Sequence, residues 1–290
     1  MLDFRLGYLY SLSPIHCGGE GDLGNILDIV REAHTDFPYI PGSSLRGSFR
    51  SDLSNLDKNT ADALFGKELD SAGQMGVHQV WFGDARLLWV PMRTLFLAGP
   101  GNIFTWVSCH SLIRDHAILA DLDCPDFPSH AVGTRAGSYS VAEAQINVSA
   151  MSDEQKAICN LGAKFPQQLN SAVGTSWNNN RIVLCDSDFY TLMEHSLWTQ
   201  IRNKIQDEDG VNPEGTAEVF WTDICIPRDT IFYFPWGYSL LQNSSLTTED
   251  HQKLMQIVQG LIQVGGQANV GRGWVKSWIN NLTSPIAEEN

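Results

Sequence analysis

Short apolar runs limit what this chain can fold into. The longest of them, such as residues 87–90 (Leu-Leu-Trp-Val) and 230–234 (Thr-Ile-Phe-Tyr-Phe), contain the aromatic and β-branched residues that favour strands. Both fall far short of the roughly 20 residues that a membrane helix needs. Residues 1–8 show no basic segment followed by an apolar one, so no secretory signal is expected. The sequence therefore predicts a cytoplasmic, globular protein that is built around buried strands and has no membrane partner.

Periodicity and turn chemistry place the expected elements along the chain. Strands are expected at residues 1–12, 80–90, 104–108, 217–227, 228–234 and 273–279. Helices are expected from residue 43 onwards and at 60–65, 111–122, 186–204 and 248–263. Residues 207–215 are rich in turn-forming types and indicate a projecting hairpin. The polar stretch 123–180 shows no firm pattern and is interpreted as an inserted lobe.

The charge of the chain restricts how it can meet nucleic acid. It carries 33 acidic and 19 basic residues, a net charge of −14, which excludes binding by bulk attraction to phosphates. Twelve of the basic residues are arginines. Contact with RNA must therefore come from a few placed arginines, backbone N–H groups and stacking aromatic rings. The six cysteines form no C-x-x-C pair and are interpreted as reduced, semi-buried residues.

One segment offers such contacts at the start of a helix. Ser43 or Ser44 is suited to the N-cap, and Arg46 and Arg50 lie four residues apart on one helix face. A helix N-terminus with hydroxyl groups and two arginines can bind phosphates without a basic surplus. The alternative interpretation is a capped helix whose arginines face solvent.

Glycines near the end of the chain form a second candidate. Gly265, Gly266, Gly271 and Gly273 permit positive φ and close backbone approach, which suits a loop that presents N–H groups to phosphates. The alternative interpretation is a tight turn before the last strand. A further Gly-rich stretch, residues 18–24, is typical of a surface loop.

Three sets of segments stand in the order of a known family. They are residues 16–19 (His-Cys-Gly-Gly) with 37–47 (Phe-Pro-Tyr-Ile-Pro-Gly-Ser-Ser-Leu-Arg-Gly), residues 82–88 with 104–109, and residues 261–273 (Leu-Ile-Gln-Val-Gly-Gly-Gln-Ala-Asn-Val-Gly-Arg-Gly). With them the chain resembles the RAMP superfamily, and within it the backbone subunit of type III-B (Cmr-type) CRISPR effector complexes.

The resemblance implies a fold. It implies an α+β protein with a ferredoxin-like, RRM-related antiparallel sheet core, large insertions and a projecting β-hairpin thumb. Residues 1–290 would form a single domain, in which 123–180 is the inserted lobe and about 203–220 is the thumb hairpin.

The resemblance also implies a function and partners. Subunits of this kind bind CRISPR guide RNA along a filament of head-to-tail copies, together with other subunits of the complex, and cut complementary target RNA at regular intervals. On this basis the residues expected to bind RNA are His16, Arg31, Ser43, Ser44, Arg46, Arg50, Gly265, Gly266, Gly271 and Arg272.

Cleavage in the family needs an aspartate in the N-terminal loop and a divalent metal, here expected to be transiently bound Mg²⁺. Family members read Ile-Asp-Leu-Pro, two residues, then Arg-Glu, whereas this chain reads Ile-Leu-Asp-Ile-Val-Arg-Glu over 26–32. The catalytic candidate is therefore Asp28, with Asp22 and Glu20 as alternatives. His16 and His34 flank the loop as candidate bases. A carboxylate there can hold Mg²⁺ or take the proton of a ribose 2′-hydroxyl that attacks its own phosphate.

The missing proline and the displaced aspartate leave two functions open. One is a metal-dependent endoribonuclease, and the other is a catalytically inactive RNA-binding scaffold of the same complex. A sister subunit that caps the complex is a third interpretation. A loose group of potential zinc ligands fits no regular spacing, so no resident metal site is predicted; its members are Cys109, His110, His116, Cys124 and His130.

Overall fold

The computed structural model describes residues 4–18, 25–67, 78–161, 165–205, 217–239 and 247–279. Within these ranges no helix is long and apolar enough to cross a membrane. The helices are α1 (Gly42–Leu56), α2 (Lys58–Phe65), α3 (His110–Leu119), α4 (Asp153–Ile158), α5 (Gln167–Asn179), α6 (Asp186–Glu194) and α7 (Thr248–Val258). The strands are β1 (Arg5–Ser11), β2 (Ile26–Leu27), β3 (Tyr39–Ile40), β4 (Val80–Phe82), β5 (Ala85–Phe96), β6 (Phe104–Cys109), β7 (Val132–Gly133), β8 (Gly137–Val141), β9 (Ala144–Ala150), β10 (Arg181–Leu184), β11 (Trp198–Ile205), β12 (Ala217–Cys225), β13 (Ile231–Tyr238), β14 (Leu261–Gln263) and β15 (Trp274–Ile279).

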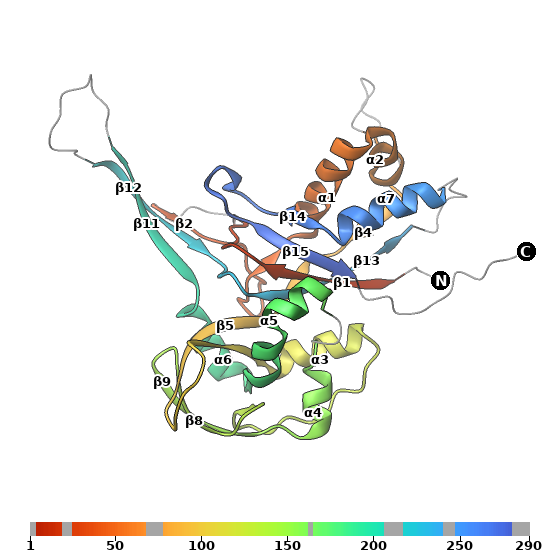
Figure 1. Cartoon of the computed structure of the whole chain (residues 1–290). Coiled ribbons are helices and arrows are strands. Elements are labelled where there is room, and N and C mark those ends of the chain that lie inside the picture. Colours follow the sequence, from red (N-terminus) through yellow and green to blue (C-terminus); the bar gives the residue numbers. More distant parts are fainter. Residues whose placement is uncertain are drawn as a thin grey trace, which may run out of the picture.

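One half of the fold is an antiparallel sheet in the order β14-β15-β1-β13-β5. The N-terminal strand β1 lies inside it, with Gly7 opposite Phe234 of β13 on one side and Ile279 of β15 on the other. Helices α1, α2 and α7 pack together against this sheet, at the upper right of Figure 1. Gly7 is required where it stands, because an added Cβ would lie 2.2 Å from the Phe234 ring.

The other half is a closed ring of six strands, β5-β6-β10-β7-β9-β8, in which β8 returns to pair with β5. The pairs β6–β10 and β7–β9 are parallel, because each is joined by a long connection rather than a hairpin. The protein is α+β with an antiparallel sheet in one half, as predicted, but the mixed six-stranded barrel in the other half was not expected. Strands β7, β8 and β9 come from residues 123–180, which therefore complete the ring.

Two apolar cores lie on opposite faces of this framework. One holds Leu45 and Phe49 of α1 together with Phe232 and Phe234 of β13. The other holds alternate residues of the same strands, with Trp177 of α5 packed edge-on between Trp89 and Trp106. Alternation along the strands thus buries both faces, and the aromatic runs noted in the sequence are the strands that do so.

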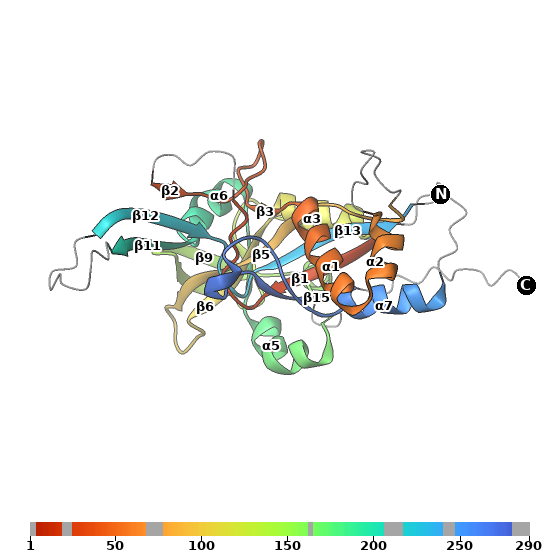
Figure 2. The ribbon, with the colours of Figure 1, turned by 90° about the horizontal axis from the view of Figure 1, so that it is seen from above.

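Strands β11 and β12 form an antiparallel ribbon in a separate three-stranded sheet with β2. Figures 1 and 2 show this ribbon, here called the β11–β12 ribbon, extending away from the rest of the molecule. It lies where the thumb hairpin is predicted. The predicted turn at 207–215 lies outside the described residues.

Three expected helix boundaries are wrong. The helix expected at 248–263 ends at Val258, and residues 261–263 form strand β14, which pairs with β15. Helix α1 begins at Gly42 after Pro41, and no side chain caps it, so neither Ser43 nor Ser44 is the N-cap. Pro41 has the extended φ and ψ of a residue that precedes a helix, and proline has no N–H to satisfy. The predicted helix at 186–204 ends at Glu194, and β11 follows, because pairing with β12 outweighs the helical spacing of the apolar residues.

Candidate functional site

Four segments that are far apart in the sequence meet at the base of the β11–β12 ribbon. Strand β2 runs parallel to β12, with Ile26 opposite Thr222 (Figure 1). The residues just after β2 bridge to the N-terminal segment, where Ile29 pairs with Gly18. The loop between β14 and β15 closes on the same segment, because the Gly273 N–H donates to the Pro14 carbonyl at 2.9 Å. We call this region the ribbon junction.

Asp28 lies at the ribbon junction, directly after β2, and 37% of its side chain is exposed. Its Oδ1 accepts the N–H of Ile29 at 2.7 Å and lies 3.6 Å from the guanidinium of Arg31. The carboxylate is thus held close to its own backbone by one oxygen. The alternatives Asp22 and Glu20 lie outside the described residues, and the catalytic role of Asp28 stays a prediction.

Arg31 is engaged by three carboxylates. Its guanidinium contacts Glu194 of α6 at 2.5 and 3.4 Å and lies 3.7 Å from Asp36, in addition to Asp28. Burial alone would lower the pKa of Arg31, but the hydrogen bond to Glu194 and the charges of Asp28 and Asp36 raise it above its usual range. Arg31 therefore ties the loop to α6, and its predicted contact with RNA would have to compete with these ion pairs.

His16 is buried in the ribbon junction. Its Nδ1 lies 2.9 Å from the carbonyl of Ile224 in β12, and because a carbonyl only accepts, Nδ1 is the donor of this hydrogen bond. Its Nε2 lies 3.8 Å from where a Cβ at Gly18 would be. The exposed His34 is not part of this arrangement.

The β14–β15 loop adopts the positive φ values that its glycines predict. Gly265, Gly271 and Gly273 have φ between 74° and 83°, whereas Gly266 does not have a positive φ. In this structure the N–H groups of three of these glycines donate within the protein, and the predicted contact with phosphates stays a prediction. The N–H of Gly266 donates to the His16 carbonyl, that of Gly271 to Ala268 and that of Gly273 to Pro14. The loop uses these groups to hold the N-terminal segment and its own turn.

Arg272 is buried beneath this loop, with 3% of its surface exposed. It donates to Asp223 Oδ2 at 3.0 Å and to Gln200 Oε1 at 2.8 Å, and also contacts Gln267 and Cys225. The ring of Trp198 lies 4.9 Å from its guanidinium carbon. In this structure Arg272 joins the loop to the ribbon and does not face solvent; its predicted contact with RNA stays a prediction.

The two arginines of α1 share one helix face, as the spacing predicts, and that face is turned toward α2. Arg46 donates to the Phe65 carbonyl and its guanidinium carbon lies 5.5 Å from the Phe65 ring centroid. Burial and the nearby charge of Arg50 lower the pKa of Arg46. Arg50 lies 3.5 Å from Asp62. Both arginines are therefore half-buried contacts between helices rather than solvated side chains.

The structure thus divides the predicted residues between two places. One group lies at the ribbon junction and comprises His16, Asp28, Arg31, Gly265, Gly266, Gly271 and Arg272. The other lies on α1 and comprises Ser43, Ser44, Arg46 and Arg50, of which Ser43 is exposed. Sequence analysis missed Asp223, Gln200 and Glu194, because no motif marks them and their partners lie far away in the sequence.

The loose Cys and His group does not assemble. Among residues 4–18, 25–67, 78–161, 165–205, 217–239 and 247–279, no three His, Cys, Asp or Glu side chains gather so as to hold a metal ion. His116 is instead buried beside Tyr8, with 3.0 Å between Nε2 and the phenol oxygen.

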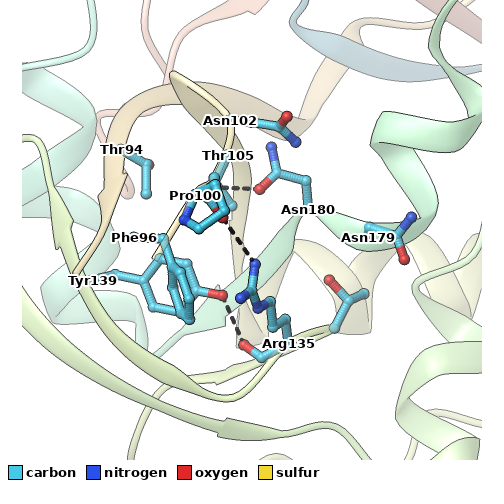
Figure 3. A pocket seen from close by; sticks show the side chains of 11 residues that line it. Thr94, Phe96, Pro100, Asn102, Thr105, Arg135, Tyr139, Asn179 and Asn180 are labelled. Atoms are coloured by element: carbon cyan, nitrogen blue, oxygen red, sulfur yellow. Dashed lines mark hydrogen bonds between the residues drawn. The ribbon is translucent and has the colours of Figure 1, made fainter. Parts of the chain in front are cut away.

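A recess of about 430 Å³ lies in the other half of the molecule, between the end of β5, the end of α5 and the start of β8 (Figure 3). Arg135 lies over the Phe96 ring at 3.7 Å and donates to the Pro100 carbonyl, while Thr105 donates to Asn180. None of the predicted site residues lines it. Its polar groups bond largely to one another, so the recess is a separate feature from the ribbon junction.

Comparison with known proteins gives the family. The family model of the RAMP superfamily matches residues 8–276. A curated relative, the CRISPR system Cmr endoribonuclease Cmr4 of Pyrococcus furiosus, is 26% identical over 297 residues, which cover 95% of each protein.

Solved structures match over nearly the whole length. The crystal structure of oligomeric Cmr4 from Pyrococcus furiosus is 20% identical, with a TM-score of 0.70 over 98% of this chain and 100% of that one. A chain in the cryo-EM structure of the type III-B Cmr-beta complex bound to cognate target RNA is 18% identical, with a TM-score of 0.72 over 95% of this chain and 96% of that one. The chain therefore belongs to the RAMP superfamily and is related to Cmr4 of type III-B Cmr complexes.

Proposed function

We propose that this chain is the backbone subunit of a type III-B effector complex, where it binds guide RNA and cuts complementary target RNA, with Asp28 as the acting carboxylate. The observation that carries the proposal is the position of Asp28. It is a partly exposed carboxylate at the ribbon junction of a chain related over its whole length to a Cmr endoribonuclease. Repeated subunits would bring one such carboxylate to the target RNA per copy.

The chemistry proposed is transesterification within the target strand. The ribose 2′-oxygen attacks the adjacent phosphorus, the P–O5′ bond breaks, and the leaving O5′ takes up a proton from water, which gives a 2′,3′-cyclic phosphate and a 5′-hydroxyl. Asp28 Oδ1 is occupied by Ile29 and Arg31, so Oδ2 is the oxygen that would receive the 2′-hydroxyl proton. His16, whose Nδ1 is engaged by Ile224 and whose Nε2 is not part of that bond, is the second candidate base of the junction. One carboxylate is a sparse site, so holding the RNA in line would supply most of the rate.

Mg²⁺ fits these residues only as an ion that is shared between the protein and the bound RNA. Mg²⁺ commonly binds through one or two carboxylates together with substrate phosphates and water. Asp28 offers one carboxylate, and the described residues provide no larger ligand group. Bound there with the RNA, Mg²⁺ would neutralise charge on the phosphate.

Assembly would provide the RNA affinity that the single chain lacks. The net charge of −14 opposes binding by the free protein, and the arginines of α1 and of the β14–β15 loop are engaged within it. A head-to-tail filament of copies, with other subunits of the complex, would align the remaining contacts along one groove. The oligomeric Cmr4 structure of similar fold supports this arrangement. We expect weak RNA binding by the monomer and tight binding by the assembly.

The test compares Asp28→Asn with Asp36→Asn in the reconstituted, guide-loaded complex. Both substitutions remove one carboxylate from beside Arg31, and both keep the size of the side chain. Asp36 has a φ of 60°, which asparagine tolerates. We expect regularly spaced products of a labelled complementary RNA with Mg²⁺ from the unchanged protein and from Asp36→Asn, and none from Asp28→Asn, with target binding intact in all three.

Loss of cleavage in both variants would mean that Asp28 acts only as an ion-pair partner of Arg31 and not as the catalytic carboxylate. Cleavage that persists in Asp28→Asn would exclude Asp28 as the acting group. If no protein cuts despite tight binding, the chain is a scaffold. One observation favours that second function: Asp28 Oδ1 is already engaged by Ile29 and Arg31, as expected of a loop carboxylate with a structural role.

A further inference from the structure

A buried ion cluster holds the ribbon junction together. Its centre is Asp223 of β12, of which none is exposed. Asp223 Oδ2 accepts from Arg202 of β11 at 3.2 Å and from Arg272 of the β14–β15 loop at 3.0 Å. Its Oδ1 accepts no hydrogen bond from any residue that the structure describes. The carboxylate therefore depends on these two arginines, which come from different segments.

Arg272 connects Asp223 to the β14–β15 loop. Its Nη2 donates to Gln200 of β11, and its Nη1 contacts Gln267 at the turn of its own loop. Gln267 has a φ of 62°, a left-handed conformation that a bond from its side chain helps to fix. The cluster thus sets where the loop lies relative to the ribbon.

The strand that carries Asp223 also places the residues around Asp28. Asp223 itself is the pairing partner of Leu27, the residue before Asp28, and the neighbouring Thr222 donates to the Asn25 carbonyl at 2.7 Å. The carbonyl of Ile224, on the other side of Asp223, holds His16. Strand β2 is only two residues long, so its placement follows that of β12.

We propose that Asp223, through Arg272 and Arg202, is a positioning residue that fixes the loop with Asp28 against the β11–β12 ribbon. The inference rests on the proposed function where it concerns cleavage. Asp223 touches no RNA in this arrangement, since it is buried, and it acts by setting where Asp28 and His16 stand. A small displacement of a group that must meet its substrate in line reduces the rate strongly.

Asp223→Asn is the main variant, because it keeps the shape and removes the charge that pairs with both arginines. In the guide-loaded complex we expect target RNA to bind as tightly as before and to be cut at least tenfold more slowly, with Mg²⁺ present. In the isolated protein we expect faster amide hydrogen exchange in peptides that cover 25–30 and 217–225, and unchanged exchange in β1. The exchange measurement does not depend on cleavage.

A second variant covers the case in which Asp223→Asn does not fold. Gln200→Leu removes the bond between β11 and Arg272 without leaving a buried charge unpaired. It should show the same local increase in exchange and a smaller loss of cleavage. Ile113→Ala, in the core on the far side of the molecule, serves as the control for general destabilisation.

The outcomes separate this inference from the proposed function. Cleavage by Asp223→Asn at the unchanged rate, or a loss equal to that in Ile113→Ala at matched melting temperature, would overturn the positioning role. If the unchanged protein does not cut target RNA, the proposed endoribonuclease function is wrong. The amide hydrogen exchange measurement alone then tests the positioning role of Asp223. If exchange in Asp223→Asn is faster only in and around residues 25–30 and 217–225, the result supports the ion cluster as the structure that places this loop. If exchange is faster in all strands, the positioning role is refuted.

Discussion

The contact between the β14–β15 loop and the N-terminal segment can be tested with two glycines of similar positive φ. Gly265 has a φ of 74° and Gly271 a φ of 78°. A Cβ at Gly265 would lie 2.4 Å from the His16 carbonyl oxygen and 3.0 Å from Cys17 Sγ, whereas a Cβ at Gly271 would meet nothing within 4 Å. Alanine at the two sites therefore differs only in the crowding of the new methyl group.

The magnitudes follow from that difference. A left-handed conformation costs an alanine about 1–2 kcal/mol, partly offset by about 0.4–1 kcal/mol from the lower entropy of the unfolded chain. Gly271→Ala should therefore lower the free energy of unfolding by about 1 kcal/mol. Gly265→Ala adds a displacement of the His16 backbone, and overpacking of this kind costs about 1–3 kcal/mol more. The total for Gly265→Ala is about 2–4 kcal/mol.

The assay is equilibrium unfolding in urea for both variants and the unchanged protein. We expect the midpoint to fall for both, further for Gly265→Ala, with the slope of the transition unchanged. Exchange of the Gly266 amide, which donates to the His16 carbonyl, should accelerate in Gly265→Ala only. Equal losses of stability in the two variants would refute the close approach as the reason for glycine at 265.

Two further predictions follow from charged and reactive groups. Hydrogen bonds from Lys253 and Thr60 lower the pKa of Asp57 from 3.8 to about 2, so its contribution to stability is complete above about pH 4 and is lost as the pH falls toward 2. Asp57→Asn should flatten the fall in melting temperature between these pH values; an unchanged fall would count against the pairing. Native alkylation at pH 8, followed by mass spectrometry, should modify the exposed Cys124 first, and comparable labelling of the buried thiols would contradict the fold. Burial raises the pKa of three of these thiols to about 12: Cys17, Cys109 and Cys159.

Features with a local cause could be predicted from the sequence. The helix after residue 41, the end of α2 at Gly66 and the positive φ of Gly265 and Gly271 all follow from residue types and their spacing. The aromatic runs 87–90 and 230–234 are buried strands as expected. In each case the residues that decide the structure are neighbours in the chain.

Features that depend on contacts between residues far apart in the sequence could not be predicted. Arg272 stands in a Gly-rich loop, where an arginine is expected to face solvent, and its partners Asp223 and Gln200 are far away in the sequence. The segment 198–205 has apolar residues at helical spacing, but pairing with β12 makes it a strand. The same holds for 123–180, whose strands β8 and β9 consist largely of small and polar residues and pair with each other and with strands from outside this segment to complete the ring.

The position of β1 has a consequence for how the protein is made. Strand β1 is made well before both of its partners, since β13 and β15 lie in the last quarter of the sequence. All six strands of the ring precede β13 in the chain, so they are synthesised while both edges of β1 still lack their partners. Unpaired edges promote aggregation, and pairings between distant segments form slowly. We therefore expect β1 to complete its pairing only after β13 and β15 have been synthesised, and its edges to be the part of the growing chain most prone to aggregation.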